Sequence, residues 1–245
     1  MYKPHRDFEL PKNNPKIWRY MDFTKFMDML DKESIFFTRS DKFDDKFEGT
    51  YPILNKVIRK HLYTNQLHDL NPEEQEKVVE SFDDFEEKFK FFRRFILINC
   101  WHVNEYESAA MWNLYLKNEE GIAIQSNVER LKKSFERPQE TVHIGKVEYI
   151  DYNNAVIPEG RLYIPFMNKR KSFEHEHELR VLHQLDVKNK VEYGIPIKCD
   201  LSELIEKIYV APTAPDWFFN LVDSMCKKFK LNVDVERSEL SELPK

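Results

Sequence analysis

Glycine is scarce in this chain, with five residues in 245, and none of them stands near another. A phosphate-cradling G-x-x-x-x-G-K-[ST] loop or a dinucleotide-binding G-x-G-x-x-G turn needs several glycines close together. The scarcity therefore excludes the nucleotide-binding folds that depend on these loops.

Cysteine and long apolar runs are also in short supply. The three cysteines, Cys100, Cys199 and Cys226, are widely separated and have neither C-x-x-C spacing nor histidines at zinc-finger intervals. The N-terminus has no apolar signal-peptide core, and no stretch approaches the roughly 18 apolar residues of a membrane span. We therefore expect a cytoplasmic protein in a reducing compartment, with no membrane partner.

Charge of one sign is not in excess, because 38 Lys and Arg residues face 43 Asp and Glu residues, for a formal net charge of -5. This balance argues against a surface devoted to phosphate backbones, although local basic patches are compatible with it. With 41% hydrophobic and 14% aromatic residues, the chain can bury a core of ordinary size.

The hydrophobic pattern predicts one α+β domain over residues 1–245. Residues 1–15 contain three prolines and are expected to form an irregular lead-in, and residues 50–95 a helical insertion in which Ile53, Val57 and Ile58 share one side. Strands are expected at 17–21, 34–38, 95–101, 122–124, 142–150, 161–166, 178–183, 192–198, 207–211 and 231–235, and further helices near 22–30, 108–115 and 216–229. The result should be a mixed, mostly antiparallel sheet core, which could divide into two small sheets around a cleft.

The densest cluster of ionisable residues lies between Lys169 and Leu182. If this segment is a strand, Glu176, Glu178 and Arg180 share one face, because side chains alternate. If it is a helix, residues two apart diverge and the cluster dissolves. A solvated strand face with an Arg180 ion pair is the structural alternative. His175 and His177 lack a third ligand at a recognisable spacing, so they are a weak signal for a metal.

A second polar cluster, residues 38–49, follows the expected strand 34–38. Its Asp residues favour an ordered turn, because they bond nearby backbone amides. The functional alternative is the rim of a ligand site, with Arg39 available to a phosphate.

A third cluster begins at Cys100 and His102 and continues into the helix with Met111, Trp112 and Tyr115. The helical stripe is typical of core packing. Cys100 and His102 lie two residues apart, but nothing indicates an activated thiolate, and a buried thiol is the simpler interpretation.

These clusters, in this order, resemble the bacterial family called domain of unknown function 2971. The resemblance rests on Trp18-Arg19-Tyr20, Phe43-Asp44-Asp45, Phe47-Glu48-Gly49, Cys100-Trp101, Met111-Trp112-Asn113-Leu114-Tyr115 and the tail Phe173, Glu176, Glu178, Arg180. It spans about residues 17 to 237. This chain departs from the family at two positions: Lys46 stands where the family often has proline, and Phe173 stands where it often has tryptophan. The family implies no activity, so function has to be argued from the site.

The order of elements is also similar to that of ADP-ribosyltransferases, in which NAD lies in a cleft between two small sheets without glycine-rich loops. The similarity implies that Glu178 contacts the nicotinamide ribose and stabilises an oxocarbenium charge, and that Glu176 orients or deprotonates the acceptor. It also implies that Arg19 or Arg39 holds the pyrophosphate of NAD and that Tyr20 or Phe43 stacks on nicotinamide. Arg180, beside the glutamates, would be a further NAD-binding residue. NAD would be the substrate, and the acceptor of ADP-ribose would be a protein or a nucleic acid. No metal ion is expected at the site.

Two other hypotheses stay open. One is a non-catalytic module in a phage-defence or toxin-type system that binds a nucleotide or peptide, in which Glu176 and Glu178 are dispensable. The other is a Mg²⁺-dependent nuclease or phosphoesterase, in which Asp44 and Asp45 join the two glutamates as oxygen ligands. If Arg19 and the two glutamates converge on one cleft, the arrangement favours the NAD hypothesis. If the carboxylates cluster without Arg19, it favours the Mg²⁺ hypothesis.

Overall fold

The computed structural model describes residues 1–67, 70–116 and 119–241, which form a single α+β domain. The strands are β1 (Lys16–Asp22), β2 (Ser34–Arg39), β3 (Ile96–Val103), β4 (Gly121–Asn127), β5 (His143–Lys146), β6 (Glu148–Ile150), β7 (Asn168–Arg170), β8 (Glu178–Gln184), β9 (Gly194–Lys198), β10 (Lys207–Val210) and β11 (Asp234–Arg237). None of the helices in these segments combines the length and apolar character needed to cross a membrane.

One large sheet organises the domain. Its strands follow the order β11-β10-β4-β1-β3-β2-β9, while β8 pairs with β3 and β5 pairs with β8. Pairing is antiparallel except between β10 and β11, and β6 and β7 form a separate parallel pair. The predicted mixed, mostly antiparallel sheet is confirmed.

The sheet forks beside β3. Strand β1 pairs with the end of β3 at His102 and Val103, whereas β2 pairs near its start at Leu97 and Ile98. Between these contacts, residues 99–101 are paired with β8 on one edge and with neither β1 nor β2 on the other. Because β1 and β2 both run antiparallel to β3, they are parallel to each other, and the helix between them spans the fork.

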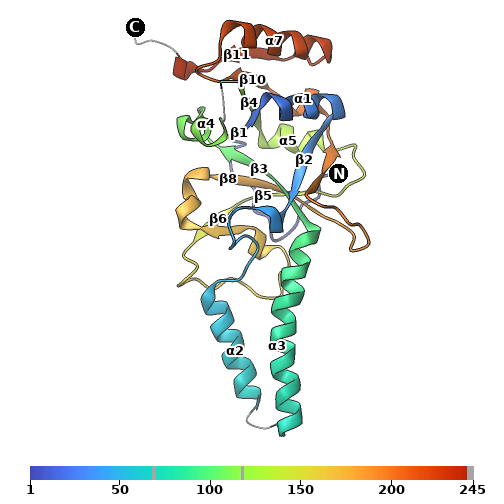
Figure 1. Cartoon of the computed structure of the whole chain (residues 1–245), viewed down its shortest axis with the longest axis vertical. Helices are drawn as coiled ribbons and strands as arrows, with labels where there is room; N and C mark the ends of the chain where they lie inside the picture. The colour runs from blue at the N-terminus through green and yellow to red at the C-terminus, as the bar shows by residue number, and fades with distance from the viewer. Residues whose placement is uncertain (68–69, 117–118, 242–245) are drawn as a thin grey trace.

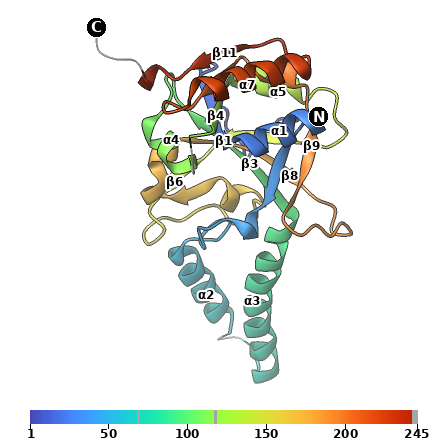
Figure 2. The same cartoon turned by 45° about the horizontal axis from the view of Figure 1, so that its top comes forward.

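Helices α1 (Phe23–Lys32), α5 (Val128–Ser134) and α7 (Asp216–Lys228) cover one side of the sheet (Figures 1 and 2). Their buried side chains join those of the strands in one hydrophobic core. Asp22 caps α1, as its carboxylate accepts a hydrogen bond from the Lys25 N–H at 2.8 Å. The remaining short helices are α4 (Ala109–Tyr115) and α6 (Leu201–Leu204).

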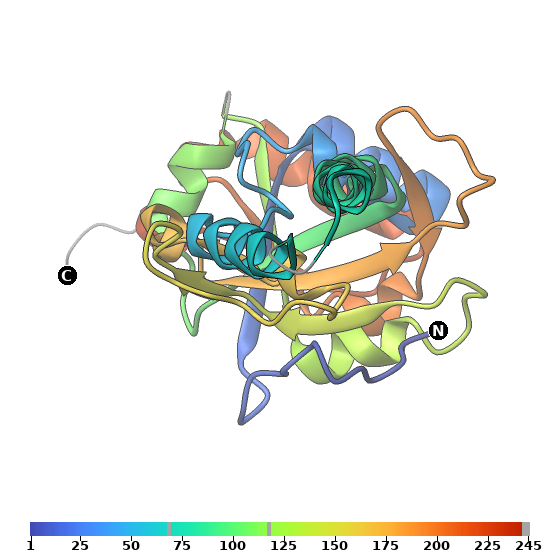
Figure 3. The same ribbon diagram turned by 90° about the horizontal axis from the view of Figure 1, so that it is seen from below.

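Helices α2 (Ile53–Leu67) and α3 (Pro72–Phe92) lie side by side and project from the opposite side of the sheet (Figures 1 and 3). The expected apolar side of α2 is exposed: Ile53, Val57 and Ile58 are 49%, 55% and 45% accessible. The buried side carries polar residues instead. Asn55 bonds the Ile157 backbone, and Arg59 pairs with Glu159 while stacking 4.1 Å from the Phe85 ring.

Several expected elements differ from the structure. Residues 161–166 are not a strand; Pro165 lies in a 3-10 turn over Ile164–Phe166, in which hydrogen bonds span three residues. Residues 142–150 divide into β5 and β6, which belong to different sheets. The last strand starts at Asp234 rather than at residue 231, and helices α5 and α6 were not expected. The lead-in 1–15 runs along β5: the Lys3 N–H donates to the carbonyl of Val142, just before β5, and the Lys146 N–H of β5 donates to the Glu9 carbonyl.

Candidate functional site

The fork in the sheet holds a cavity of about 540 Å³, which is within the usual range for small-molecule sites. Its walls come from β1, β2, β3 and α1, and Tyr115, Glu176 and Glu178 close the side toward β8. The cavity therefore exists because β1 and β2 separate and leave the backbone edge of residues 99–101 without a paired strand.

Arg19 projects a cationic group into this cavity. One guanidinium nitrogen donates a hydrogen bond of 2.6 Å to the Cys100 carbonyl, an oxygen on the β3 edge that neither β1 nor β2 pairs. No carboxylate in the described segments forms an ion pair with Arg19. Burial lowers the pKa of this guanidinium from its usual value, yet arginine keeps its charge at neutral pH. Its free donors are suited to an anionic ligand.

Aromatic residues line the same cavity. Tyr20 and Phe43, the two expected ring-binding residues, are both part of the wall. The Tyr20 hydroxyl accepts a hydrogen bond from the Ser108 N–H at 2.8 Å, and its ring packs edge-on against Trp112 at 5.0 Å. Tyr20 is thus fixed by α4, whereas Phe43 lies in the loop after β2 and is partly exposed.

Glu176 and Glu178 converge, but not as neighbours on a continuous strand. Glu176 ends a 3-10 turn over Lys171–Glu176, and β8 begins only at Glu178. Between them, His177 adopts a left-handed conformation with φ 40°. The strand predicted at 178–183 is confirmed for Glu178 and Arg180, whereas Glu176 precedes that strand and reaches the cavity from the end of the turn.

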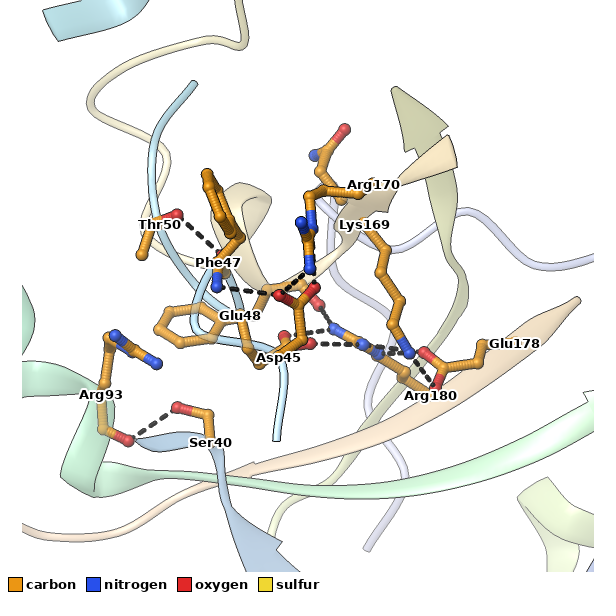
Figure 4. A network of polar contacts seen from close by, with 12 residues as sticks. Ser40, Asp45, Phe47, Glu48, Thr50, Arg93, Lys169, Arg170, Glu178 and Arg180 are labelled. Atoms are coloured by element: carbon orange, nitrogen blue, oxygen red, sulfur yellow. Dashed lines mark hydrogen bonds and ion pairs between the residues drawn. The ribbon is translucent and has the colours of Figure 1, made fainter. Parts of the chain in front are cut away.

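Buried charges of alternating sign hold the two glutamates, and Figure 4 shows the part of this network around Glu178. The Lys169 ammonium contacts Glu178 at 3.1 Å and also bonds Glu176. Arg180 donates to the other oxygen of Glu178 at 2.8 Å and forms a two-point ion pair with Glu48, at 2.6 and 2.8 Å. Both oxygens of Glu178 thus have cationic donors, so its carboxylate is fixed in orientation.

The two glutamates titrate in opposite directions. Burial, followed by the negative charge of Glu178, raises the pKa of Glu176 to about 7. Burial also opposes ionisation of Glu178, but Arg180 and then Lys169 outweigh it and lower the pKa of that carboxyl. At neutral pH, Glu178 is ionised and Glu176 is close to half-protonated, the state in which a carboxyl exchanges protons most readily.

Two of the expected ligand-binding residues lie outside the cavity wall. Arg39 makes a two-point ion pair with Asp41 at 2.9 and 2.6 Å and bonds the Val191 carbonyl, so its donors are engaged. Arg180 is fully buried behind Glu178. Its guanidinium can position Glu178 but does not reach a ligand.

Sequence reasoning missed Lys169 and Glu48 as parts of this network. Both belong to charged segments that were singled out, but their partners are distant in the chain or depend on the turn at His177. Asp45, one of the carboxylates that the Mg²⁺ hypothesis needs, is bound by Arg170 at 2.7 Å. Within the described segments, no three His, Cys, Asp or Glu side chains gather as metal ligands.

Comparisons with known proteins add little to this geometry. No protein-family model and no curated protein matches the sequence, so membership of the domain of unknown function 2971 family stays a prediction. Two solved structures are similar over most of the chain. DarT of Thermus sp. 2.9 in complex with NAD+ has a TM-score of 0.44 and 8% identity, covering 96% of this chain and 100% of that chain. DarT of Thermus sp. 2.9 in complex with ADP-ribosylated single-stranded DNA has a TM-score of 0.41 and 9% identity, covering 95% and 97%. At this level of likeness, function has to be argued from the site.

Proposed function

We propose that this protein binds NAD in the fork of the sheet and cleaves the bond between nicotinamide and ribose, transferring ADP-ribose to an acceptor. The observation that carries the proposal is the pairing of opposite charges across one cavity. Among the residues that the structure describes, Arg19 has no carboxylate partner for its donors, and Glu178 is an ionised carboxylate fixed in orientation.

The binding role of each wall follows from its chemistry. Arg19 would hold the diphosphate, because guanidinium donors match phosphate oxygens. Tyr20 and Phe43 would contact the nicotinamide ring, and the apolar side chains of β2 and α1 would exclude water from the rest of the ligand. This arrangement uses no glycine-rich loop, which agrees with a chain of five glycines.

The proposed chemistry needs a carboxylate that stays ionised beside a developing cation. As the glycosidic bond breaks, its electron pair leaves with nicotinamide, and positive charge grows on the ribose carbon. Glu178 would stabilise that charge, and its fixed orientation means that little reorganisation accompanies the step. The acceptor oxygen or nitrogen would then bond to the ribose carbon as its proton passes to Glu176, whose raised pKa suits a general base.

We propose a protein or nucleic-acid acceptor, with water as the acceptor in its absence, so that the isolated protein hydrolyses NAD slowly. The non-catalytic binding module is the alternative outcome: it keeps the Arg19 site for a nucleotide but uses neither glutamate.

The test is calorimetric titration of the purified protein with NAD, with nicotinamide release followed in the same samples, beside a Glu178→Gln variant. Binding with release that the variant lacks supports NAD cleavage. Binding without release in either protein favours the binding module. The absence of both heat and nicotinamide would contradict the proposal.

A further inference from the structure

Buried polar atoms without partners gather at the fork. In the described segments, such atoms include Asn99 Oδ1, Trp101 Nε1 and His102 Nε2, all from residues of β3 that line the cavity. A buried donor or acceptor left unpaired costs roughly 1–3 kcal/mol, so each calls for a physical reason. Side chains alternate along a strand, so Asn99 and Trp101 share one face of β3 and His102 lies on the other, and a ligand in the cavity would supply the partner that His102 Nε2 lacks.

His102 is the most informative of the three, because its protonation can be derived. Its Nδ1 lies 2.7 Å from the Glu176 carbonyl oxygen, which can only accept, so Nδ1 carries the hydrogen. Burial lowers the pKa of the imidazole, and neighbouring His177 and His175 add to the effect. The ring is therefore neutral, and Nε2 presents a bare lone pair.

The sheet register places His102 beside the proposed reaction centre. His102 stands directly opposite Glu178 in the antiparallel pair of β3 and β8, so the two side chains lie on the same face. Besides Glu178, the ionisable groups near His102 include His175, Tyr20, which is 6.4 Å away between ring centroids, and His177, whose ring is 6.0 Å away. His102 itself is only 4% exposed.

We infer that His102 is a ligand-binding residue whose Nε2 accepts a hydrogen bond from a hydroxyl of the nicotinamide ribose. The inference rests on the proposed function. A bare lone pair needs an O–H or N–H donor, which the diphosphate lacks at neutral pH. Among the donors of NAD, the hydroxyls of the nicotinamide ribose are those expected beside Glu178, and Glu178 is the residue opposite His102.

The alternative is that His102 only positions Glu176 through Nδ1. Two substitutions separate these roles. His102→Asn keeps a donor near the Nδ1 position and removes the Nε2 acceptor, whereas His102→Gln reaches the Nε2 position and gives up the Nδ1 donor. His143→Asn is the matched control, because His143 also bonds a carbonyl through Nδ1, at 2.8 Å from Lys3 O, and lies outside the cavity.

The experiment measures dissociation constants for NAD by calorimetry, with thermal unfolding of each variant as a check on folding. A second ligand, an NAD analogue lacking both hydroxyls of the nicotinamide ribose, completes the comparison. We expect His102→Asn to weaken NAD binding about tenfold, His102→Gln less so, and His143→Asn not at all. Wild type and His102→Asn should bind the analogue equally.

Each other outcome has a defined meaning. If His102→Asn binds NAD like wild type while His102→Gln does not, His102 only positions Glu176 and the inference is wrong. If His102→Asn weakens NAD and the analogue alike, the partner is not a ribose hydroxyl and the inference is again wrong. If the wild-type protein binds no NAD, the proposed function is wrong, and the role inferred for His102 is wrong with it. The wild-type protein alone shows this result, so it is distinguishable from the outcomes that depend on the variants.

Discussion

Glu48 and Arg180 are 132 residues apart in the sequence and meet as a two-point ion pair, both side chains fully shielded from solvent. Arg180 also contacts Glu178 at 2.7 Å, so the orientation of the proposed catalytic carboxylate depends on a residue of the loop that leads into α2. This contact joins the loop before α2 to β8 beside the fork of the sheet, and Figure 4 shows Glu48, Arg180 and Glu178 together.

Breaking this ion pair should destabilise the fold. Glu48→Leu leaves a buried guanidinium with one carboxylate in place of two, and removing one partner of a buried ion pair costs about 3–5 kcal/mol. Glu48→Gln, which keeps an acceptor, should cost less. Urea unfolding followed by circular dichroism measures the difference in the free energy of unfolding.

The control for this prediction is Asp28→Asn, which breaks a helix-surface ion pair with Lys32 in which each side chain is 48% exposed. It should change the free energy of unfolding by less than about 0.5 kcal/mol. Equal losses in Glu48→Leu and Asp28→Asn would show that the buried pair does not stabilise the domain as argued.

Arg19 and Arg39 should differ sharply in their effect on NAD binding. Arg19→Gln removes the guanidinium that faces the cavity, and a charge-assisted hydrogen bond contributes about 1.5–3 kcal/mol, so affinity should fall roughly tenfold to a hundredfold. Arg39→Gln should leave affinity unchanged, because Arg39 is engaged by Asp41 outside the cavity. Calorimetric titration of each variant with NAD measures the two affinities. If only Arg39→Gln lost affinity, the diphosphate would not bind at Arg19, which would contradict the proposal.

Local patterns in the sequence were enough to predict the strands that build the site. Alternation and short apolar runs located β1, β2, β3 and β8, and the helix expected near 22–30 corresponds to α1. These features are encoded within a few positions of the chain.

The fork and the charge network could not be predicted, because they depend on distant pairings. Nothing local to β1 or β2 indicates that they meet β3 at different points. In the sequence, nothing distinguishes Glu48 from other acidic loop residues, because its role depends on the contact with Arg180. The left-handed conformation of His177 occurs without a glycine, so the turn by which Glu176 reaches the cavity was not predicted.

The stability of the protein should fall as pH rises from about 4.5 to 7, in part because of Glu176. Its pKa is about 7 in the folded state against 4.5 ordinarily, so in this window the folded state holds a proton that the unfolded state has lost. The effect reaches at most about 3 kcal/mol. Glu176→Gln removes this titration, so the variant should gain stability relative to wild type as pH rises. Urea unfolding at several pH values tests this, and a constant difference would contradict it.

Lys169 should set the pH at which the site works. Its ammonium is shared by Glu176 and Glu178, and Lys169→Met removes the cation that favours ionisation of both. Because the acceptor step needs ionised Glu176, its rate should rise with pH, and the midpoint of that rise should move to higher pH in the variant. Lys171→Met, at an exposed neighbouring position, is the control and should keep the wild-type midpoint. An unchanged midpoint in Lys169→Met would show that Lys169 does not influence the titration of Glu176.

The central claim is that the fork between β1 and β2 is an NAD site, and a crystal structure of the wild-type protein with an NAD analogue whose nicotinamide–ribose bond cannot be cleaved tests it most directly. The account predicts the analogue in the fork, with its diphosphate at Arg19 and its nicotinamide ribose between Glu178 and His102. An analogue bound at another surface, or in the fork with its diphosphate away from Arg19, would contradict it.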